Sequence, residues 1–388
     1  MPQIPPMRLT GAQCLIDGHM MGEALTLADG QIADGPAREV DLTSYLLLPA
    51  IIDLHGDGFE RHLSPRPTAP FDKRRALTSV AAELAANGVA TAWLAQSWSW
   101  EGGFRSGAAT LDLLAALHDV RAGLLADCRV QIRLETHIPT EFDQVAQAVT
   151  TYGVDYVVFN NHLPEALDMA QNHPHRFASW AAQTKRTAEE MLHIVQAADA
   201  AGADVPLALA KLAAGFQASG VQMGSHDDGT AETRAFYHSI GAPNCEFPTT
   251  VAAAQAARGA GEPVLMGAPN VVRGGSQSGN IAAQSLIEAG LCDALVSDYY
   301  YPALAQAAFY LVDAGVLDLP AAWAMISSNP AQIAGLHDRG TLAVGKRADL
   351  VAVNAETRAV EMTICAGKIA HLSGEAARRV WSASAPVT

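Results

Sequence analysis

The stretch Ile51-Ile52-Asp53-Leu54-His55-Gly56-Asp57-Gly58 joins an apolar run to a polar end. It closes the apolar segment 46–54, which predicts a strand buried on both faces, as in a parallel sheet. Residues two positions apart in a strand point the same way. His55 and Asp57 can therefore converge on one metal ion, and the structural alternative is a strand end followed by a solvated polar turn.

Seven further apolar segments follow along the chain, and helical patterns stand between most of them. One such pattern covers residues 73–86 and ends before Gly88. This alternation predicts an α/β fold and favours a (β/α)8 TIM-like barrel over a doubly wound sheet. The segment 163–204 is long for one crossover and is expected to add helices over the barrel mouth. The expected strands are residues 46–54, 89–96, 129–135, 154–160, 221–224, 244–247, 264–266 and 294–297.

Both ends of the chain have the pattern of short strands separated by turns. Near the amino end, short apolar pairs are separated by Asp-Gly and Met-Gly breaks. Near the carboxyl end, residues 349–354 and 360–371 predict strands around a Cys-Ala-Gly-Lys turn. We therefore expect a small β-sandwich domain built from residues 1–48 and 340–388, and a barrel over residues 49–339.

Composition excludes several classes of protein. The chain has 388 residues, 49% of them hydrophobic, and a net charge of -15, so it lacks the basic face needed to bind nucleic acid or an anionic membrane. Its five cysteines are scattered and form no CxxC pair, which indicates a reducing compartment. We find no signal-peptide pattern and no apolar run long enough to span a bilayer, and we expect a cytoplasmic location.

Further polar residues follow the predicted strands in the same way as His55 and Asp57. A single histidine of this kind is more often structural, and Glu135 can instead pair with Arg133. The convergence of several such residues at strand ends nevertheless favours a metal site. They are Glu135, His162, His226 and Asp298, at the ends of the third, fourth, fifth and eighth strands.

This set of nitrogen and oxygen ligands suits zinc, manganese or a similar divalent metal, and we expect one or two ions per chain. Two ions that share Glu135 would generate hydroxide near neutral pH. Asp298 is expected to hold one ion and to act as the general base. His137 is the alternative ligand to Glu135, which is preferred; otherwise it supports the ligands or is simply a loop histidine.

A second group of residues predicts an anion site. The segment Arg273-Gly274-Gly275-Ser276-Gln277-Ser278-Gly279-Asn280 follows the seventh strand and is expected to lead into a helix. Backbone N–H groups at a helix start attract anions, and an arginine can bind phosphate with two hydrogen bonds. The alternative is a flexible loop before a capped helix. The expected phosphate-binding residues are Arg273, Gly274, Gly275, Ser276 and Asn280; Lys185 and Arg186 offer a further phosphate contact or an exposed helix face.

Several segments resemble known enzymes. The tail Asn329-Pro330-Ala331, then DRGTLAVGKRADLVAVN (338–354) and Ala366-Gly367-Lys368, is similar to the closing signature of the amidohydrolase superfamily. The resemblance to the phosphonate-utilisation PhnM family extends over nearly the whole chain. It is carried by HGDGFERHLSPRP (55–67), SHDDGT (225–230), EFPTT (246–250), VLMGAPNVVRGGSQSGN (264–280) and SDYYYPAL (297–304).

This resemblance implies hydrolysis of α-D-ribose 1-methylphosphonate 5-triphosphate to pyrophosphate and the 5-phosphate. It also implies a metal centre at His55, Asp57, Glu135, His162, His226 and Asp298. The expected partner is a small phosphorylated sugar, with no nucleic acid and no membrane, and the candidate assembly is a homodimer. Two rival hypotheses are a C–N hydrolase such as a deaminase or cyclic amidase, disfavoured by the anion loop, and a metal-free scaffold subunit, disfavoured by the full ligand set.

Overall fold

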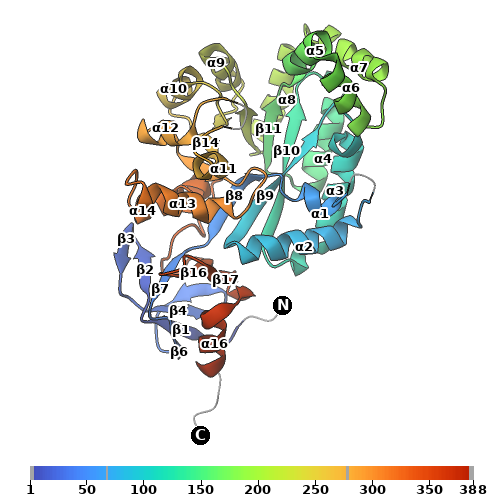
Figure 1. Ribbon diagram of the computed structural model, residues 1–388. Helices are drawn as coiled ribbons and strands as arrows, with labels where there is room; N and C mark the ends of the chain where they lie inside the picture. Colours follow the sequence, from blue (N-terminus) through green and yellow to red (C-terminus); the bar gives the residue numbers. More distant parts are fainter. Residues whose placement is uncertain (1–3, 67–68, 277–278, 384–388) are drawn as a thin grey trace.

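The computed structural model describes residues 4–66, 69–276 and 279–383, and Figure 1 shows a barrel surrounded by helices with smaller sheets beside it. The eight barrel strands follow one another in chain order, and each is parallel to the next. The predicted (β/α)8 barrel is thereby confirmed. Its strands are β8 (Ile51–Gly56), β9 (Val89–Trp98), β10 (Asp127–Glu135), β11 (Tyr156–Asn160), β12 (Gln222–His226), β13 (Asn244–Glu246), β14 (Val264–Gly267) and β15 (Ala294–Val296).

The single strand predicted over residues 46–54 is wrong, because this segment contributes to two sheets. Strand β7 (Tyr45–Pro49) pairs antiparallel with a strand of the small domain, whereas β8 pairs with β9 in the barrel. Proline has no N–H with which to continue a ladder. The Pro49 carbonyl instead accepts a hydrogen bond from Trp323 Nε1 at 2.9 Å. An apolar run alone does not reveal where a chain passes from one sheet to the next.

The barrel closes where its last strand meets its first. Gly56 and Asp298 form a parallel bridge just beyond β15. The backbone N–H of Asp298 donates to the His55 carbonyl at 3.0 Å, and the Asp298 carbonyl accepts from the N–H of Asp57 at 2.8 Å. Backbone bonds at this closure therefore also fix the positions of three predicted site residues.

A buried carboxylate two residues before His55 on β8 strengthens the same closure. Asp53 on β8 is fully buried and accepts hydrogen bonds from the backbone N–H of Ser297 at 2.9 Å and from its hydroxyl at 2.6 Å. Burial raises the pKa of Asp53 above its ordinary value. These bonds join β8 to the residue that follows β15, in addition to the bridge between Gly56 and Asp298.

Helices pack around the barrel and connect its strands. Helix α2 shows why they form, since Asp72 caps its first turn and Leu77, Val80 and Leu84 are buried along one face. It spans the predicted residues 73–86. The outer helices are α2 (Lys73–Ala86), α3 (Gly107–Val120), α4 (Phe142–Tyr152), α8 (Val205–Ala218), α9 (Ala231–Ser239), α10 (Val251–Gly259), α12 (Ala283–Glu288) and α13 (Ala303–Asp313).

The long insertion after β11 adds helices, as predicted. They are α5 (Leu163–Asn172), α6 (Pro174–Gln183) and α7 (Ala188–Ala200), grouped at the upper right of Figure 1. The remaining α-helices in the described part of the chain are shorter or lie near its end. These are α1 (Glu60–Leu63), α11 (Ala268–Val272), α14 (Leu319–Ala324), α15 (Ser328–Ile333) and α16 (Gly374–Ala383).

Strands from both ends of the chain form the small β domain at the bottom of Figure 1. One sheet has the order β5 (Gln31–Ala33), β4 (Leu25–Ala28), β1 (Met7–Thr10), β6 (Arg38–Asp41). The other has the order β18 (Lys368–Leu372), β17 (Val360–Cys365), β16 (Leu350–Asn354), β7, β2 (Gln13–Ile16), β3 (His19–Met21). The domain has its own apolar core, which includes Leu9, Val40, Leu47, Leu350 and Ile364.

Among the described residues, no helix combines the length and apolarity that a membrane crossing requires. All five cysteines are free, which agrees with the absence of a disulfide framework expected from their spacing.

We predict that Gly367→Ala destabilises the protein far more than Gly290→Ala. Both glycines have a left-handed backbone, with φ of 70° and 68°, so alanine costs about 1–2 kcal/mol at either position. At Gly367 a Cβ would also lie 2.4 Å from the Cα of Gly30 in the facing sheet, whereas at Gly290 it meets nothing within 4 Å. Forcing the two turns apart adds about 1–3 kcal/mol. Denaturant unfolding of both variants measures the difference, and equal losses would contradict this packing.

Candidate metal centre and phosphate loop

A cavity of about 770 Å3 lies at the carboxyl ends of the barrel strands. This is the end of a parallel barrel where catalytic groups gather. The structure brings most of the predicted site residues to the wall of this one cavity. They are His55, Asp57, His162, His226 and Asp298 of the predicted metal set, with Arg273, Gly275, Ser276 and Asn280 of the predicted phosphate set.

His55 is oriented by a buried carboxylate from the sixth barrel strand. Its Nδ1 lies 2.7 Å from Glu246 Oε2. The other oxygen, Glu246 Oε1, accepts from Gln131 Nε2 at 2.8 Å and from the Tyr156 hydroxyl at 2.5 Å. Burial opposes ionisation of Glu246, but His55 holds its pKa below the ordinary value. With both oxygens occupied, Glu246 positions His55 and leaves the Nε2 of that ring for a metal.

His226 lies between an acidic and a basic neighbour. Its Nδ1 is 2.9 Å from Asp227 Oδ2, and its Nε2 is 3.4 Å from the Nη2 of Arg133. The same guanidinium lies 3.6 Å from Asp57 Oδ2. Burial lowers the pKa of His226 and so favours the neutral imidazole that binds metals. Arg133 thus contributes a fixed positive charge among the predicted ligands.

Glu135 holds His162 but does not reach the cavity wall. One oxygen contacts His162 Nδ1, and the other accepts from the His162 backbone N–H at 3.2 Å. Burial opposes protonation of His162, but the bond to Glu135 raises its pKa. Glu101, Glu135 and His162 also have ligand atoms within 4.8 Å of one another. The role of Glu135 as a bridge between two metals stays a prediction.

Asp298 has the strained backbone and the shifted pKa typical of a functional residue. Its φ is 55°, unusual for a residue with a side chain, and the bonds at the barrel closure hold it there. Burial, reinforced by the charge of Asp57, raises the pKa of Asp298 to about 6. A carboxylate with that pKa can accept a proton near neutral pH.

The phosphate loop differs from the prediction in how it meets the helices. Strand β14 leads directly into α11, whose first turn contains Pro269, a residue suited to starting a helix. The predicted helix start at the end of this loop is wrong, because the next helix begins at Ala283. The N–H of Ala283 already donates to Asn270 Oδ1 at 2.9 Å. The N–H groups of Arg273, Gly274 and Gly275 also donate already, to the carbonyls of Pro269, Val271 and Asn270 in α11. Side chains of the loop, rather than these three N–H groups, would therefore bind an anion.

Within the loop, Arg273 provides the cation. Its Nη1 donates to the Tyr299 hydroxyl at 3.3 Å, and the side chain lines the cavity. Gly275 has a φ of 155°, and the loop allows its backbone to reach the cavity, whereas Gly274 is not part of the wall. Gln277 and Ser278 lie outside the described residues.

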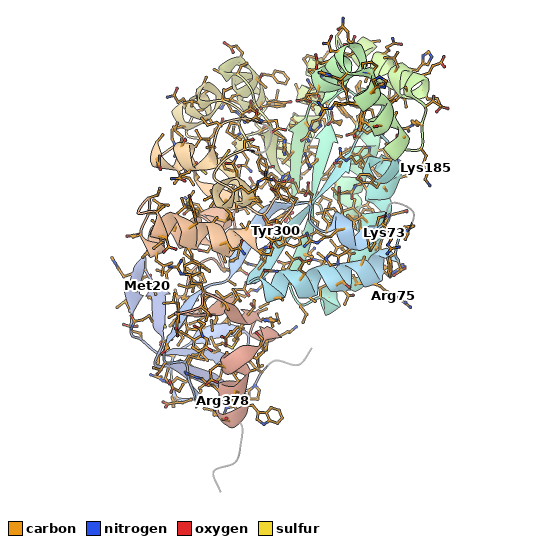
Figure 2. All side chains as sticks on the ribbon, viewed as in Figure 1. Met20, Lys73, Arg75, Lys185, Tyr300 and Arg378 are labelled. Carbon is orange, nitrogen blue, oxygen red and sulfur yellow. The ribbon has the colours of Figure 1, made fainter. Side chains whose placement is uncertain are left out.

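Other predicted contacts lie away from the cavity. Lys185 is exposed in the turn after α6 and projects at the periphery of the molecule in Figure 2. The guanidinium of Arg186 binds the Glu101 carbonyl. His137 has its Nδ1 3.1 Å from the Thr136 hydroxyl and is not part of the cavity wall.

Several functional residues escaped the sequence analysis. Glu246 lies within the strand predicted over residues 244–247 and in the quoted EFPTT segment, but nothing local reveals that it faces His55. Arg133 was considered only as a partner for Glu135, and its contacts with Asp57 and His226 depend on the closed barrel. Arg105 also lines the cavity and follows a strand that carried no motif.

The residues at this cavity fit a divalent metal centre. Imidazole rings come together there, with centroids 5.2 Å apart for His55 and His226 and 6.4 Å apart for His162 and His226. The buried Nδ1 of His226 makes no hydrogen bond with any described residue. Two carboxylates, Asp57 and Asp298, complete a set of nitrogen and oxygen donors that suits zinc or manganese.

Comparison with known proteins agrees with this geometry. The Amidohydrolase family model matches residues 177–370. The chain is 32% identical over 365 residues to Alpha-D-ribose 1-methylphosphonate 5-triphosphate diphosphatase of Escherichia coli (strain K12), covering 89% of this chain and 94% of that protein.

Solved structures share the fold at low identity. A putative prolidase from Bifidobacterium longum superposes with a TM-score of 0.65 at 15% identity, over 99% of this chain and 100% of that one. N-acetylglucosamine-6-phosphate deacetylase from Pasteurella multocida superposes with a TM-score of 0.63 at 11% identity, over 94% and 99%. At these identities the likeness concerns the fold alone.

We predict that Glu246→Gln weakens metal affinity by about 10- to 100-fold, since loss of a carboxylate that orients a ligating histidine has effects of this size. Metal titration with a chromophoric chelator measures it. Glu262→Gln is the matched control, because Glu262 is also buried and also contacts a histidine Nδ1 at 2.7 Å, that of His238, outside the cavity wall. The control is expected to lower the melting temperature but to keep metal affinity. Similar affinities for both variants would rule out the positioning role of Glu246.

Proposed function

Because the chain belongs to the amidohydrolase family, and within it to the phosphonate-utilisation PhnM family of the E. coli diphosphatase, we propose that it hydrolyses the 5-triphosphate of α-D-ribose 1-methylphosphonate 5-triphosphate. The products are pyrophosphate and the 5-phosphate. The hydrolase class follows from the family, and the phosphoric anhydride as the bond cleaved is our proposal. The observation that supports it best is that the candidate metal ligands and the Arg273 loop line one cavity.

The cavity residues can divide the reaction between them. His55, Asp57, His162, His226 and Asp298 would hold divalent metal, which when bound lowers the pKa of water and shields phosphate charge. Asp298 accepts the proton of the attacking water while the water oxygen bonds to the α-phosphorus. The bond from that phosphorus to the bridging oxygen breaks, and pyrophosphate leaves with the electron pair. Catalysis would rest on positioning and electrostatics.

The charges at the cavity wall support a triphosphate as the substrate. The chain carries a net charge of -15, which repels polyanions unless local cations reverse the field. Arg105, Arg133 and Arg273 all line the cavity, and bound metal would offset the carboxylates of Asp57, Glu165, Asp227 and Asp298 in the same wall. A C–N hydrolase acting on an uncharged amide would gain nothing from this concentration of arginine, although the family model alone is equally compatible with one.

We predict that Asp298→Asn lowers kcat by about 10²- to 10⁴-fold, because the amide keeps the shape but lacks the basic oxygen. The rate of pyrophosphate release at saturating manganese or zinc measures the effect. Circular dichroism and metal content are recorded for the same preparations. A variant that is folded, fully loaded and close to the wild-type rate would show that another group takes the proton.

We predict that Arg273→Ala lowers kcat/KM for a triphosphate by about 10- to 100-fold, the size expected for a lost charge-assisted hydrogen bond. The mono-, di- and triphosphate forms of one ribose compound are compared, and the loss should grow with phosphate number. Arg273→Lys should recover only part of it, because an ammonium lacks the planar fork. The control is Arg75→Ala on the outer face of α2, labelled in Figure 2. Equal losses for all three forms would favour a C–N hydrolase.

A further inference from the structure

Arg105 lines the cavity from a strand well separated from the one that leads to the Arg273 loop. Arg105 ends the short 3-10 helix Gly103–Arg105 that follows β9, and its side chain lines the cavity. Around the closed barrel, β14 is the third strand from β9 in one direction and the fifth in the other. Arg105 and Arg273 therefore reach the cavity from separate parts of its rim, and on the shorter path the two strands between them end at His55, Asp57 and Asp298.

The guanidinium of Arg105 is fixed on one side and free on the other. Its Nη1 donates to both oxygens of Glu101, each at 3.1 Å. Glu101 is buried and also accepts from Trp180 Nε1 at 3.3 Å, which anchors the pair to α6. Neither Nε nor Nη2 of Arg105 bonds to any residue that the structure describes, and Nε is buried.

This free edge has the geometry of an oxyanion site. The Nε and Nη2 groups of an arginine form one of the two edges that bind two oxygens of a phosphate or carboxylate side by side. A buried donor without a partner lowers stability, and a bound oxyanion would remove that cost. Because Glu101 already offsets part of its charge, Arg105 suits a singly charged group better than a triphosphate.

We propose that Arg105 binds the phosphonate group at C1 of the sugar, while the Arg273 loop binds the triphosphate at C5. The inference rests on the proposed function and names the feature that distinguishes this substrate from other ribose triphosphates. A phosphonate ester carries one negative charge on two equivalent oxygens, which match the Nε and Nη2 edge of Arg105. The protein thus selects a sugar with anions at both ends.

Two substrates that differ only at C1 test this assignment. One is α-D-ribose 1-methylphosphonate 5-triphosphate, and the other is the α-methyl riboside 5-triphosphate, which has a neutral methoxy group there. We expect Arg105→Gln to lower kcat/KM for the first by about 10- to 100-fold and for the second by much less. Arg105→Lys should recover part of the preference for the substrate with the phosphonate. If the glutamine variant does not fold, the lysine variant replaces it in this comparison.

Inhibition by product gives a readout independent of turnover. We expect the inhibition constant of α-D-ribose 1-methylphosphonate 5-phosphate to rise in Arg105→Gln by a similar factor, and that of ribose 5-phosphate to change far less. Equal effects on both ligands, or on both substrates, would overturn the assignment.

Arg273→Ala separates the two proposals, because it should reduce hydrolysis of both triphosphates alike. If it affects neither, the proposed function fails. If it affects both while Arg105→Gln does not discriminate between them, only the phosphonate site fails.

Discussion

The junction between the first and last barrel strands is the constraint on which the rest of the structure depends. A parallel barrel is stable only when its two edges meet, since an open edge leaves backbone groups without partners. Here the edges are joined by the Asp53–Ser297 bonds and by the backbone of Asp298, which is bonded to His55 and Asp57. The bonds that complete the fold are thus the bonds that assemble the site. This coupling accounts for the left-handed backbone of Asp298, which the closure stabilises.

A second regularity is that each cavity histidine has a carboxylate beside its Nδ1. The pairs are His55 with Glu246, His162 with Glu135, and His226 with Asp227. Glu246 and Glu135 each fix the tautomer and the direction of their ring through a hydrogen bond, whereas Asp227 lies 2.9 Å from His226 Nδ1 without forming one. Such an arrangement concentrates negative charge, and the arginines at the cavity wall balance it. The acidic composition of the chain and its candidate affinity for polyphosphate are therefore compatible.

The sequence predicted the features that depend on local patterns. Apolar runs located the barrel strands, and the two-residue spacing of His55 and Asp57 placed both at one strand end. Glu246 could not be assigned this way, because it contacts His55 across 191 positions and only the barrel brings them together. The helix start after the phosphate loop was misplaced because Pro269 begins a helix immediately after β14. Arg105 gave no signal, since its significance lies in the unused edge of its guanidinium.

The small β domain has a consequence for how the chain is made. Strand β7 pairs with β16, which leaves the ribosome about 300 residues later. At typical synthesis rates the delay is on the order of 15–60 s. During that time β7 can pair with β2 on one side but lacks β16 on the other, and this unpaired edge can join strands of other nascent chains. Fast barrel closure cannot shorten this interval, which ends only when β16 emerges and pairs with β7.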